Sequence, residues 1–130
     1  KIFADPCELP LVYNGDLCTL EAVQELMEAY PRLKGVMLGR GLLADPSLAR
    51  SIREGKAPDK ATLYRQVAEM HRLMYEHYSR TIEGGEAQLL AKLKTMWEYL
   101  LPDMEKKPRK AILKSNRLDA YLRAVAEALR

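Results

Sequence analysis

Short apolar runs alternate with helical patterns in the first half of the chain. Residues 10–13, Pro-Leu-Val-Tyr, and residues 35–38, Gly-Val-Met-Leu, each predict a short buried strand. Apolar side chains recur at helical spacing from Leu20 to Tyr30, and Thr19 is a suitable N-cap. A second helix is expected from Asp45 to about Glu54. Because a helix joins the two strands, we expect them to pair in parallel.

The second half of the chain shows helical patterns only. Long amphipathic helices are expected at 62–82 and 86–101, separated by Gly84-Gly85. A short helix beginning at Pro108 and a last helix capped by Asn116 follow. The sequence therefore predicts a mostly helical protein with two domains. Residues 1–57 form two parallel βα units, and residues 58–130 form an all-α helical bundle.

Composition places the chain among ordinary globular proteins. It has 130 residues, 48% of them hydrophobic, and a net charge of +3. Two cysteines, Cys7 and Cys18, without a CxxC pair give no sign of a disulfide scaffold or a zinc site. Apolar stretches are far shorter than a bilayer span, so we expect a soluble, cytoplasmic protein. The start at Lys1 suggests a piece of a longer polypeptide.

Positive charge is concentrated in the second half. Residues 1–57 carry 7 basic and 8 acidic side chains, whereas residues 58–130 carry 14 and 10. One span without any Asp or Glu contains the basic residues Lys106, Lys107, Arg109, Lys110, Lys114 and Arg117. A basic run is usually only a solvated surface. Without compensating acids, however, this one is expected to concentrate positive potential that attracts phosphate.

Two glycine-containing turns follow the two expected strands. They are Asn14-Gly15-Asp16 and Gly39-Arg40-Gly41. Glycine lets a backbone approach an anion closely, and an arginine adds a forked, charged donor. Either tripeptide alone is more often an ordinary strand-to-helix turn. Because the carboxyl ends of parallel strands lie at one edge, the pair together indicates a site for a mononucleotide phosphate.

These residues carry a family resemblance. The stretch LPLVYNGDL, followed by a helix and GVMLGRGLLADPSL, resembles the last two βα units of flavin-dependent tRNA-dihydrouridine synthases. The downstream LKTMWEYL and RLDAYLRAVAEAL segments are similar to the helical domain that follows the barrel in that family. The resemblance implies that residues 1–57 belong to an FMN-binding TIM barrel and residues 58–130 to a helical tRNA-binding domain. It also implies the reduction of uridine to 5,6-dihydrouridine in tRNA, with NADPH as the reductant.

The same resemblance implies roles for individual residues. Asn14, Gly15, Asp16, Gly39 and Arg40 would line the FMN phosphate site, while the basic residues of the span from Lys106 to Arg117 would contact tRNA. Asp45 stands where members of the family often have Asn. The catalytic cysteine of the family lies in an Asn-x-Gly-Cys-Pro type loop that this chain does not contain. We therefore assign no catalytic residue, and we expect the 130-residue chain to be inactive and not to retain FMN by itself.

Other candidates for chemistry are weaker. His71 and His77 lie about 240° apart around a helix, so a surface or partly buried role is expected for each. Trp97 fits an apolar stripe and is expected in the core rather than stacked on a base. Cys18 is expected to pack behind its turn as a small apolar residue. No metal-ligand spacing and no nucleophile elbow occur in the sequence.

Two alternative functions stay open on the sequence. One is a different FMN barrel that reduces a small molecule and uses its helical tail for oligomerisation. The other is a helical adapter or RNA-binding module without enzymatic ancestry. A partial barrel leaves sheet edges uncovered, so self-association through residues 1–57 is also expected.

Overall fold

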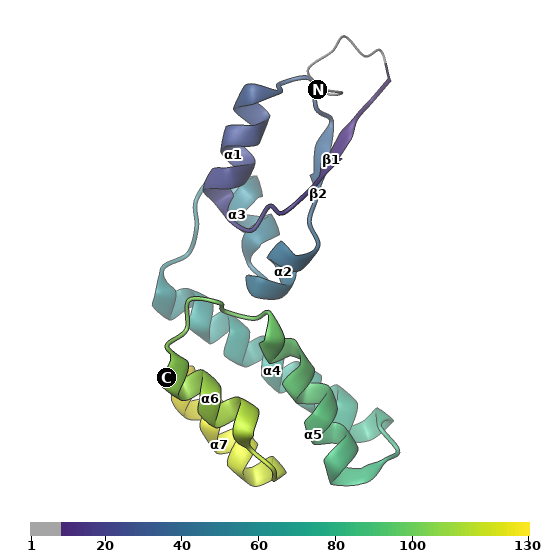
Figure 1. Cartoon of the computed structure of the whole chain (residues 1–130), viewed down its shortest axis with the longest axis vertical. Coiled ribbons are helices and arrows are strands. Elements are labelled where there is room, and N and C mark those ends of the chain that lie inside the picture. Colours follow the sequence, from purple (N-terminus) through teal and green to yellow (C-terminus); the bar gives the residue numbers. More distant parts are fainter. Residues whose placement is uncertain (1–8) are drawn as a thin grey trace. The chain divides into compact units, whose positions relative to one another are not determined.

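The computed structural model describes residues 9–130, and Cys7 lies outside the described residues. The chain divides into two compact units, Lys1–Pro58 and Asp59–Arg130, which we call unit 1 and unit 2. The boundary between the units therefore lies one residue after the one expected between residues 57 and 58. Each unit has its own elements (Figure 1).

Unit 1 contains the expected parallel pair of strands, but both strands are exposed or half-buried rather than buried as expected. β1 (Val12–Asn14) pairs with β2 (Gly35–Met37), with Val12 opposite Gly35 and Asn14 opposite Met37. The helix between them, α1 (Leu20–Ala29), begins as predicted, because the Thr19 side chain accepts a hydrogen bond of 3.1 Å from the Ala22 amide. This register brings the carboxyl ends of both strands to one edge of the sheet.

The segment after β2 differs from the sequence expectation. Gly39-Arg40-Gly41 was expected as a turn, but Gly39 is the N-cap of a short helix, α2 (Arg40–Ala44). A second helix, α3 (Leu48–Glu54), follows it. The side chain of Asp45 lies between the two helices and accepts hydrogen bonds from the amide and hydroxyl of Ser47, at 2.9 and 2.6 Å. Asp45 therefore ends one helix and supports the start of the next.

A small apolar core holds unit 1 together. α1 packs on α3, and the buried side chains are Leu17, Leu20, Val23, Leu33 and Leu48. Leu9, Val12, Met37 and Leu43 are large apolar side chains that stay more than half exposed. The expected self-association would cover such a surface, and it stays a prediction.

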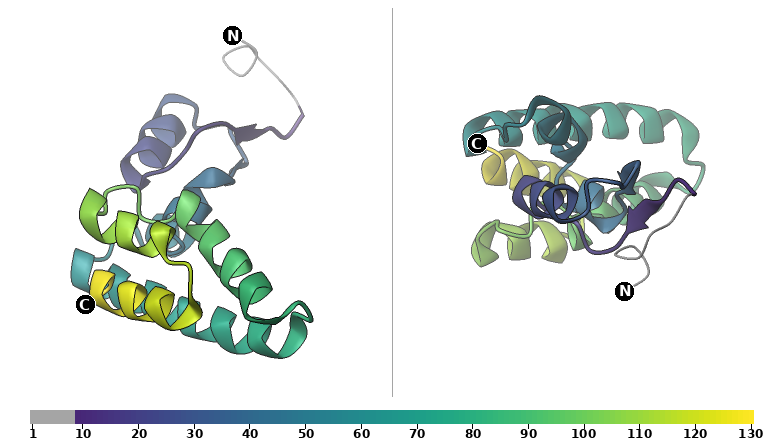
Figure 2. Two further views of the ribbon diagram at one scale, coloured as in Figure 1. Left: turned by 60° about the horizontal axis from the view of Figure 1, so that its bottom comes forward. Right: turned by 90° about the horizontal axis from the view of Figure 1, so that it is seen from above.

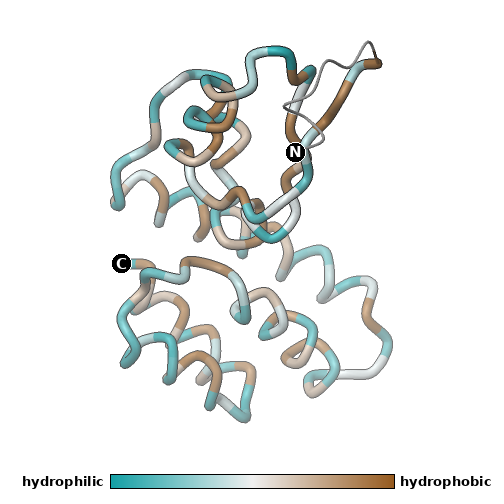
Figure 3. The backbone as a smooth tube through the Cα atoms, turned by 45° about the horizontal axis from the view of Figure 1, so that its top comes forward, coloured by the Kyte–Doolittle hydropathy of each residue, from teal (hydrophilic) through white to brown (hydrophobic). Residues whose placement is uncertain are grey.

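Unit 2 is entirely helical. It consists of α4 (Lys60–Thr81), α5 (Gly85–Thr95), the 3-10 turn η2 (Met96–Glu98), α6 (Lys106–Lys114) and α7 (Leu118–Ala128). α5 packs on both α4 and α7, and α6 lies alongside α7 (Figure 2). Along these helices hydrophobic positions alternate with hydrophilic ones, as amphipathic packing requires (Figure 3).

Trp97 lies at the centre of the unit 2 core, and its predicted burial is confirmed at 0% exposure. Around it are the fully buried side chains of Val67, Leu93, Ile112 and Tyr121. Burial of a large aromatic ring contributes strongly to stability, because the stabilisation scales with the apolar area removed from water.

Three helix ends in unit 2 differ from the sequence expectation. α5 ends at Thr95 and passes into η2, whereas one helix was expected up to Leu101. α6 begins at Lys106, two residues before Pro108. The N-cap of α7 is Arg117 rather than Asn116, and its side chain makes no capping hydrogen bond. The Leu118 amide instead donates to the Glu86 carboxylate of α5 at 3.3 Å.

Candidate phosphate and RNA sites

The two predicted phosphate turns lie together at the edge of the unit 1 sheet. The Arg40 guanidinium, at the start of α2, donates to the Asp16 carboxylate at 2.7 Å. Asp16 follows β1 and Arg40 follows β2, so this ion pair links the ends of neighbouring strands. Both side chains are mostly exposed, at 68% for Arg40 and 77% for Asp16. An exposed ion pair of this kind stabilises a fold by less than about 1 kcal/mol.

The surroundings of this ion pair fit an anion. Asn14 and Gly39 are exposed, and a Cβ added at Gly39 would meet nothing within 4 Å. The guanidinium offers several donors in a plane, which suits a phosphate. The Asp16 carboxylate repels an anion, so its fitting role is to hold Arg40 rather than to touch phosphate. The residues present are thus suited to an FMN phosphate, with Arg40 as the charged group.

Gly41, the last residue of the second tripeptide, serves packing. It is buried in α2, and a Cβ added there would collide with the backbone carbonyl oxygen of Leu17. Glycine at this position lets α2 lie directly against the chain leaving β1. Gly41 was expected in the anion-binding turn, and its packing against Leu17 depends on a residue 24 positions away in the sequence.

The basic span of unit 2 separates into residues that face outward and residues that face inward. At about 100° per residue, four lysines of α6 fall within an arc of about 100°. We call this arc the lysine face; its members are Lys106, Lys107, Lys110 and Lys114. All four are exposed, and with Ala111 they line a shallow groove of about 480 Å³. No ion pair to any of the four occurs within residues 9–130.

Arg109 points away from the lysine face. Its guanidinium donates to the carbonyl oxygens of Trp97 at 2.7 Å, Leu100 at 2.8 Å and Leu101. It therefore ties the start of α6 to the segment that follows α5. Arg117 also differs from the lysines, because its guanidinium is 3.4 Å from the Asp119 carboxylate. Of the six basic residues predicted to contact tRNA, four form one unpaired surface and two are engaged elsewhere.

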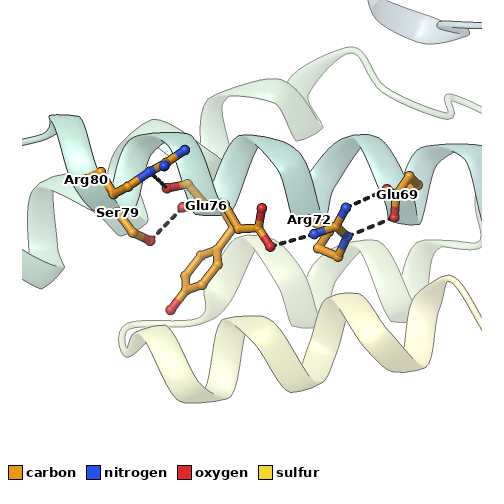
Figure 4. A network of polar contacts seen from close by, with 6 residues as sticks. Glu69, Arg72, Glu76, Ser79 and Arg80 are labelled. Carbon is orange, nitrogen blue, oxygen red and sulfur yellow. Dashed lines mark hydrogen bonds and ion pairs between the residues drawn. The ribbon is translucent and has the colours of Figure 1, made fainter.

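Some of the charges on α4 compensate one another. The Arg72 guanidinium binds the carboxylates of Glu69 at 2.6 Å and Glu76 at 2.5 Å (Figure 4). The hydrogen bond from Arg72 lowers the pKa of Glu69, and the two carboxylates raise the pKa of Arg72. Near them, Arg80 donates to the Glu76 carbonyl oxygen at 3.3 Å. α4 thus holds one arginine between two carboxylates, whereas none of the four lysines of the lysine face forms an ion pair in the described part of the chain.

A buried polar cluster that sequence reasoning missed lies beneath these surfaces. The Tyr121 hydroxyl accepts a hydrogen bond from Trp97 Nε1 at 2.9 Å and lies 2.8 Å from His71 Nε2. Burial lowers the pKa of His71 and raises the pKa of Tyr121 to about 12. His71 is only 6% exposed, which corrects the expected surface or partly buried role. His77 is exposed on the same helix, so the two histidines do not share a face.

Catalytic candidates are few in the described part of the chain. Cys18 is exposed, contrary to its expected packing behind the turn. Residues 9–130 contain no group of three or more His, Cys, Asp or Glu side chains placed to hold a metal ion. None of the helices described here is both long and apolar enough to cross a membrane.

Comparison with known proteins identifies the family of the chain. The family model described as dihydrouridine synthase (Dus) matches residues 3–123, which is most of the chain. No curated protein matches the chain closely enough to count as a relative.

Proposed function

Because the chain belongs to the dihydrouridine synthase family, we propose that it takes part in reducing uridine to 5,6-dihydrouridine in tRNA, with FMN as the flavin and NADPH as the reductant. The family consists of oxidoreductases that act on tRNA. In this proposal unit 1 belongs to the FMN-binding barrel and contacts the flavin phosphate, and unit 2 is the tRNA-binding domain. When bound, the flavin supplies the hydride that reduces the uridine ring.

At the phosphate contact, each residue has a separate role. The Arg40 guanidinium binds the phosphate, and Asp16 orients that guanidinium through the 2.7 Å contact. Gly39 allows the backbone to come close, because a Cβ there would meet nothing within 4 Å, whereas the Tyr13 side chain fills the corresponding space at Gly15. Asn14 offers a carboxamide at the end of β1. Backbone amide signals of Gly15 and Gly39 that shift with FMN but not with riboflavin would support this contact. Unchanged signals at millimolar FMN would contradict it.

The observation that carries the tRNA proposal is the lysine face. Four exposed lysines within three turns of one helix have no ion-pair partner in the described part of the chain. Lysines that neutralise RNA phosphates release counterions, so affinity falls as salt rises. Arg109 and Arg117 have partners within unit 2, and we propose the four lysines as the main phosphate contacts.

A salt titration with two matched double variants tests this surface. Lys110→Gln with Lys114→Gln removes two charges from the lysine face, and Lys60→Gln with Lys92→Gln removes two from α4 and α5. Fluorescence anisotropy with unmodified tRNA should show a slope of log affinity against log salt that drops by roughly 0.7–0.9 per lost contact in the first variant only. Equal slopes for both variants would remove the lysine face from tRNA binding.

A further inference from the structure

A second hollow of unit 2 borders the lysine face and has a different chemistry. It is a groove of about 420 Å³ between α5 and the end of α6, which we call the α5–α6 groove. Its volume falls in the range of small-ligand sites, roughly 300–1,000 Å³. Its apolar lining includes Leu90, Ala91 and Leu113. Leu113 is a large apolar side chain left 38% exposed, so the groove offers apolar area that is in contact with water.

Polar side chains stand around this apolar lining. Thr95, Glu98 and Asn116 contribute to the groove. The Thr95 hydroxyl donates to the Ala91 carbonyl oxygen at 2.9 Å, which leaves its oxygen able to accept a hydrogen bond. Asn116 is exposed, and its carboxamide has no hydrogen-bond partner within residues 9–130. Such a set offers donors and acceptors to a flat polar ring, as amides do for base edges.

The groove and the lysine face are adjacent on α6. Leu113 follows Lys110 by three residues, which places the two side chains next to each other on the helix surface. The lysines attract a polyanion, whereas inside the groove the Glu98 carboxylate is balanced by the Lys94 ammonium, which donates to the Ser115 carbonyl oxygen, so the groove suits an uncharged group. A ligand that fits both must carry phosphates beside an uncharged ring. This charge pattern distinguishes a nucleic acid from an acidic peptide, whose side chains end in carboxylates.

We propose that the α5–α6 groove receives one unstacked nucleobase of an RNA whose backbone lies on the lysine face. This inference rests on the proposed tRNA-binding function and adds a site to it. The base packs against Leu90 and Leu113, and Asn116 hydrogen-bonds its edge. The groove therefore distinguishes RNA with an exposed base, in a loop or at an end, from a fully paired duplex.

Filling the groove tests the proposal. Ala91→Leu places a larger side chain in the lining, and Ala126→Leu is the matched control on the exposed side of α7. Both positions are exposed, and leucine is nearly as good a helix former as alanine, so both variants should fold. Each is titrated in the full 130-residue chain with tRNA, a short single-stranded RNA and a blunt RNA duplex of equal length.

We expect Ala91→Leu to bind the single strand about tenfold more weakly than the control, because one base loses its packing. Its salt slope and its affinity for the duplex should stay unchanged, since no phosphate contact is lost. Equal affinities of the two variants for the single strand would show that no base binds in the groove, and this result would overturn the proposal. An equal loss on the duplex would also overturn it. Wild-type chain that binds no RNA would overturn the proposed function as well, which separates the two failures.

Discussion

Tyr121 shows how a single residue can organise the interior of unit 2. Its hydroxyl meets Trp97 Nε1, His71 Nε2 and, at 3.3 Å, the Leu93 carbonyl oxygen. These groups come from α4, α5 and η2, so one hydroxyl joins three elements to α7. A buried polar group without a partner costs about 1–3 kcal/mol, and the cluster avoids that cost for each member. These hydrogen bonds, together with apolar packing, fix how the helices of unit 2 are oriented against one another.

His71 should make the stability of unit 2 depend on pH. Burial lowers its folded-state pKa below the ordinary value of 6.5, so below that pH the unfolded chain takes up a proton more readily. The contribution of neutral His71 to stability is therefore complete above pH 6.5. Below that pH the free energy of unfolding should fall, by at most about 1.4 kcal/mol per pH unit, as the pH drops toward the folded-state pKa. Urea unfolding at several pH values between 7.5 and 5 measures this loss.

Two variants separate His71 from other titrating groups. His71→Gln should flatten the pH dependence, and His77→Gln, which changes an exposed histidine of the same helix, should leave it intact. Glu69 titrates in a lower window, because its pKa lies below 4.5 and its contribution is lost only as pH falls through that lower value. A pH dependence that persists in His71→Gln would show that another group is responsible.

Gly41 and Gly39 should respond differently to the same change. Gly41→Ala places a methyl group against the Leu17 carbonyl oxygen, and overpacking of this kind costs typically about 1–3 kcal/mol. Gly39→Ala adds the same methyl group in open space. Thermal unfolding of unit 1 should therefore occur at a lower temperature in Gly41→Ala only. Similar melting temperatures for both variants would show that α2 can move away from Leu17.

At the scale of elements, α6 depends on Arg109 for its position. Arg109→Gln removes a charged donor shared by three carbonyl groups, and we expect tRNA affinity to fall severalfold because the lysine face is no longer held in place. The salt slope should stay unchanged, since Arg109 makes no phosphate contact in this arrangement. Lys110→Gln is the comparison, and its slope should drop by roughly 0.7–0.9. An equal drop of the salt slope in Arg109→Gln and Lys110→Gln would show that Arg109 contacts a phosphate of the tRNA directly.

Elements with local signals were predictable, and elements that depend on distant contacts were not. The Thr19 cap, the apolar spacing of α1 and the short strands all lie within a few residues of sequence. α2 has five residues, too few for a periodic pattern. The apolar residues Leu100 and Leu101 continued the pattern of α5, although Leu101 has φ 50 and the helix has already ended. α7 takes its cap from Glu86, which lies 32 residues away.

The candidate sites divide in the same way. The distribution of charge along the sequence was enough to find the basic span. The two glycine turns that follow the paired strands were enough to predict that Asp16 and Arg40 lie at the same edge of the sheet. Sequence did not reveal that Arg109 faces inward, because that depends on where the carbonyl groups of Trp97 and Leu100 lie. The buried role of His71 was missed for a similar reason, since its partner Tyr121 is 50 residues away.

At the scale of the whole molecule, the side-chain hydrogen bonds that position the lysine face lie within unit 2. The Arg109 hydrogen bonds, the Lys94 bond of 2.9 Å to the Ser115 carbonyl oxygen and the Tyr121 cluster all join residues between 59 and 130. We therefore expect residues 59–130 to fold alone, with the helical circular dichroism that these elements predict, and to show the same salt slope for tRNA as the 130-residue chain. A folded unit 2 with a smaller slope would mean that unit 1 supplies phosphate contacts of its own. An unfolded unit 2 would mean that its stability depends on unit 1, despite a separate core.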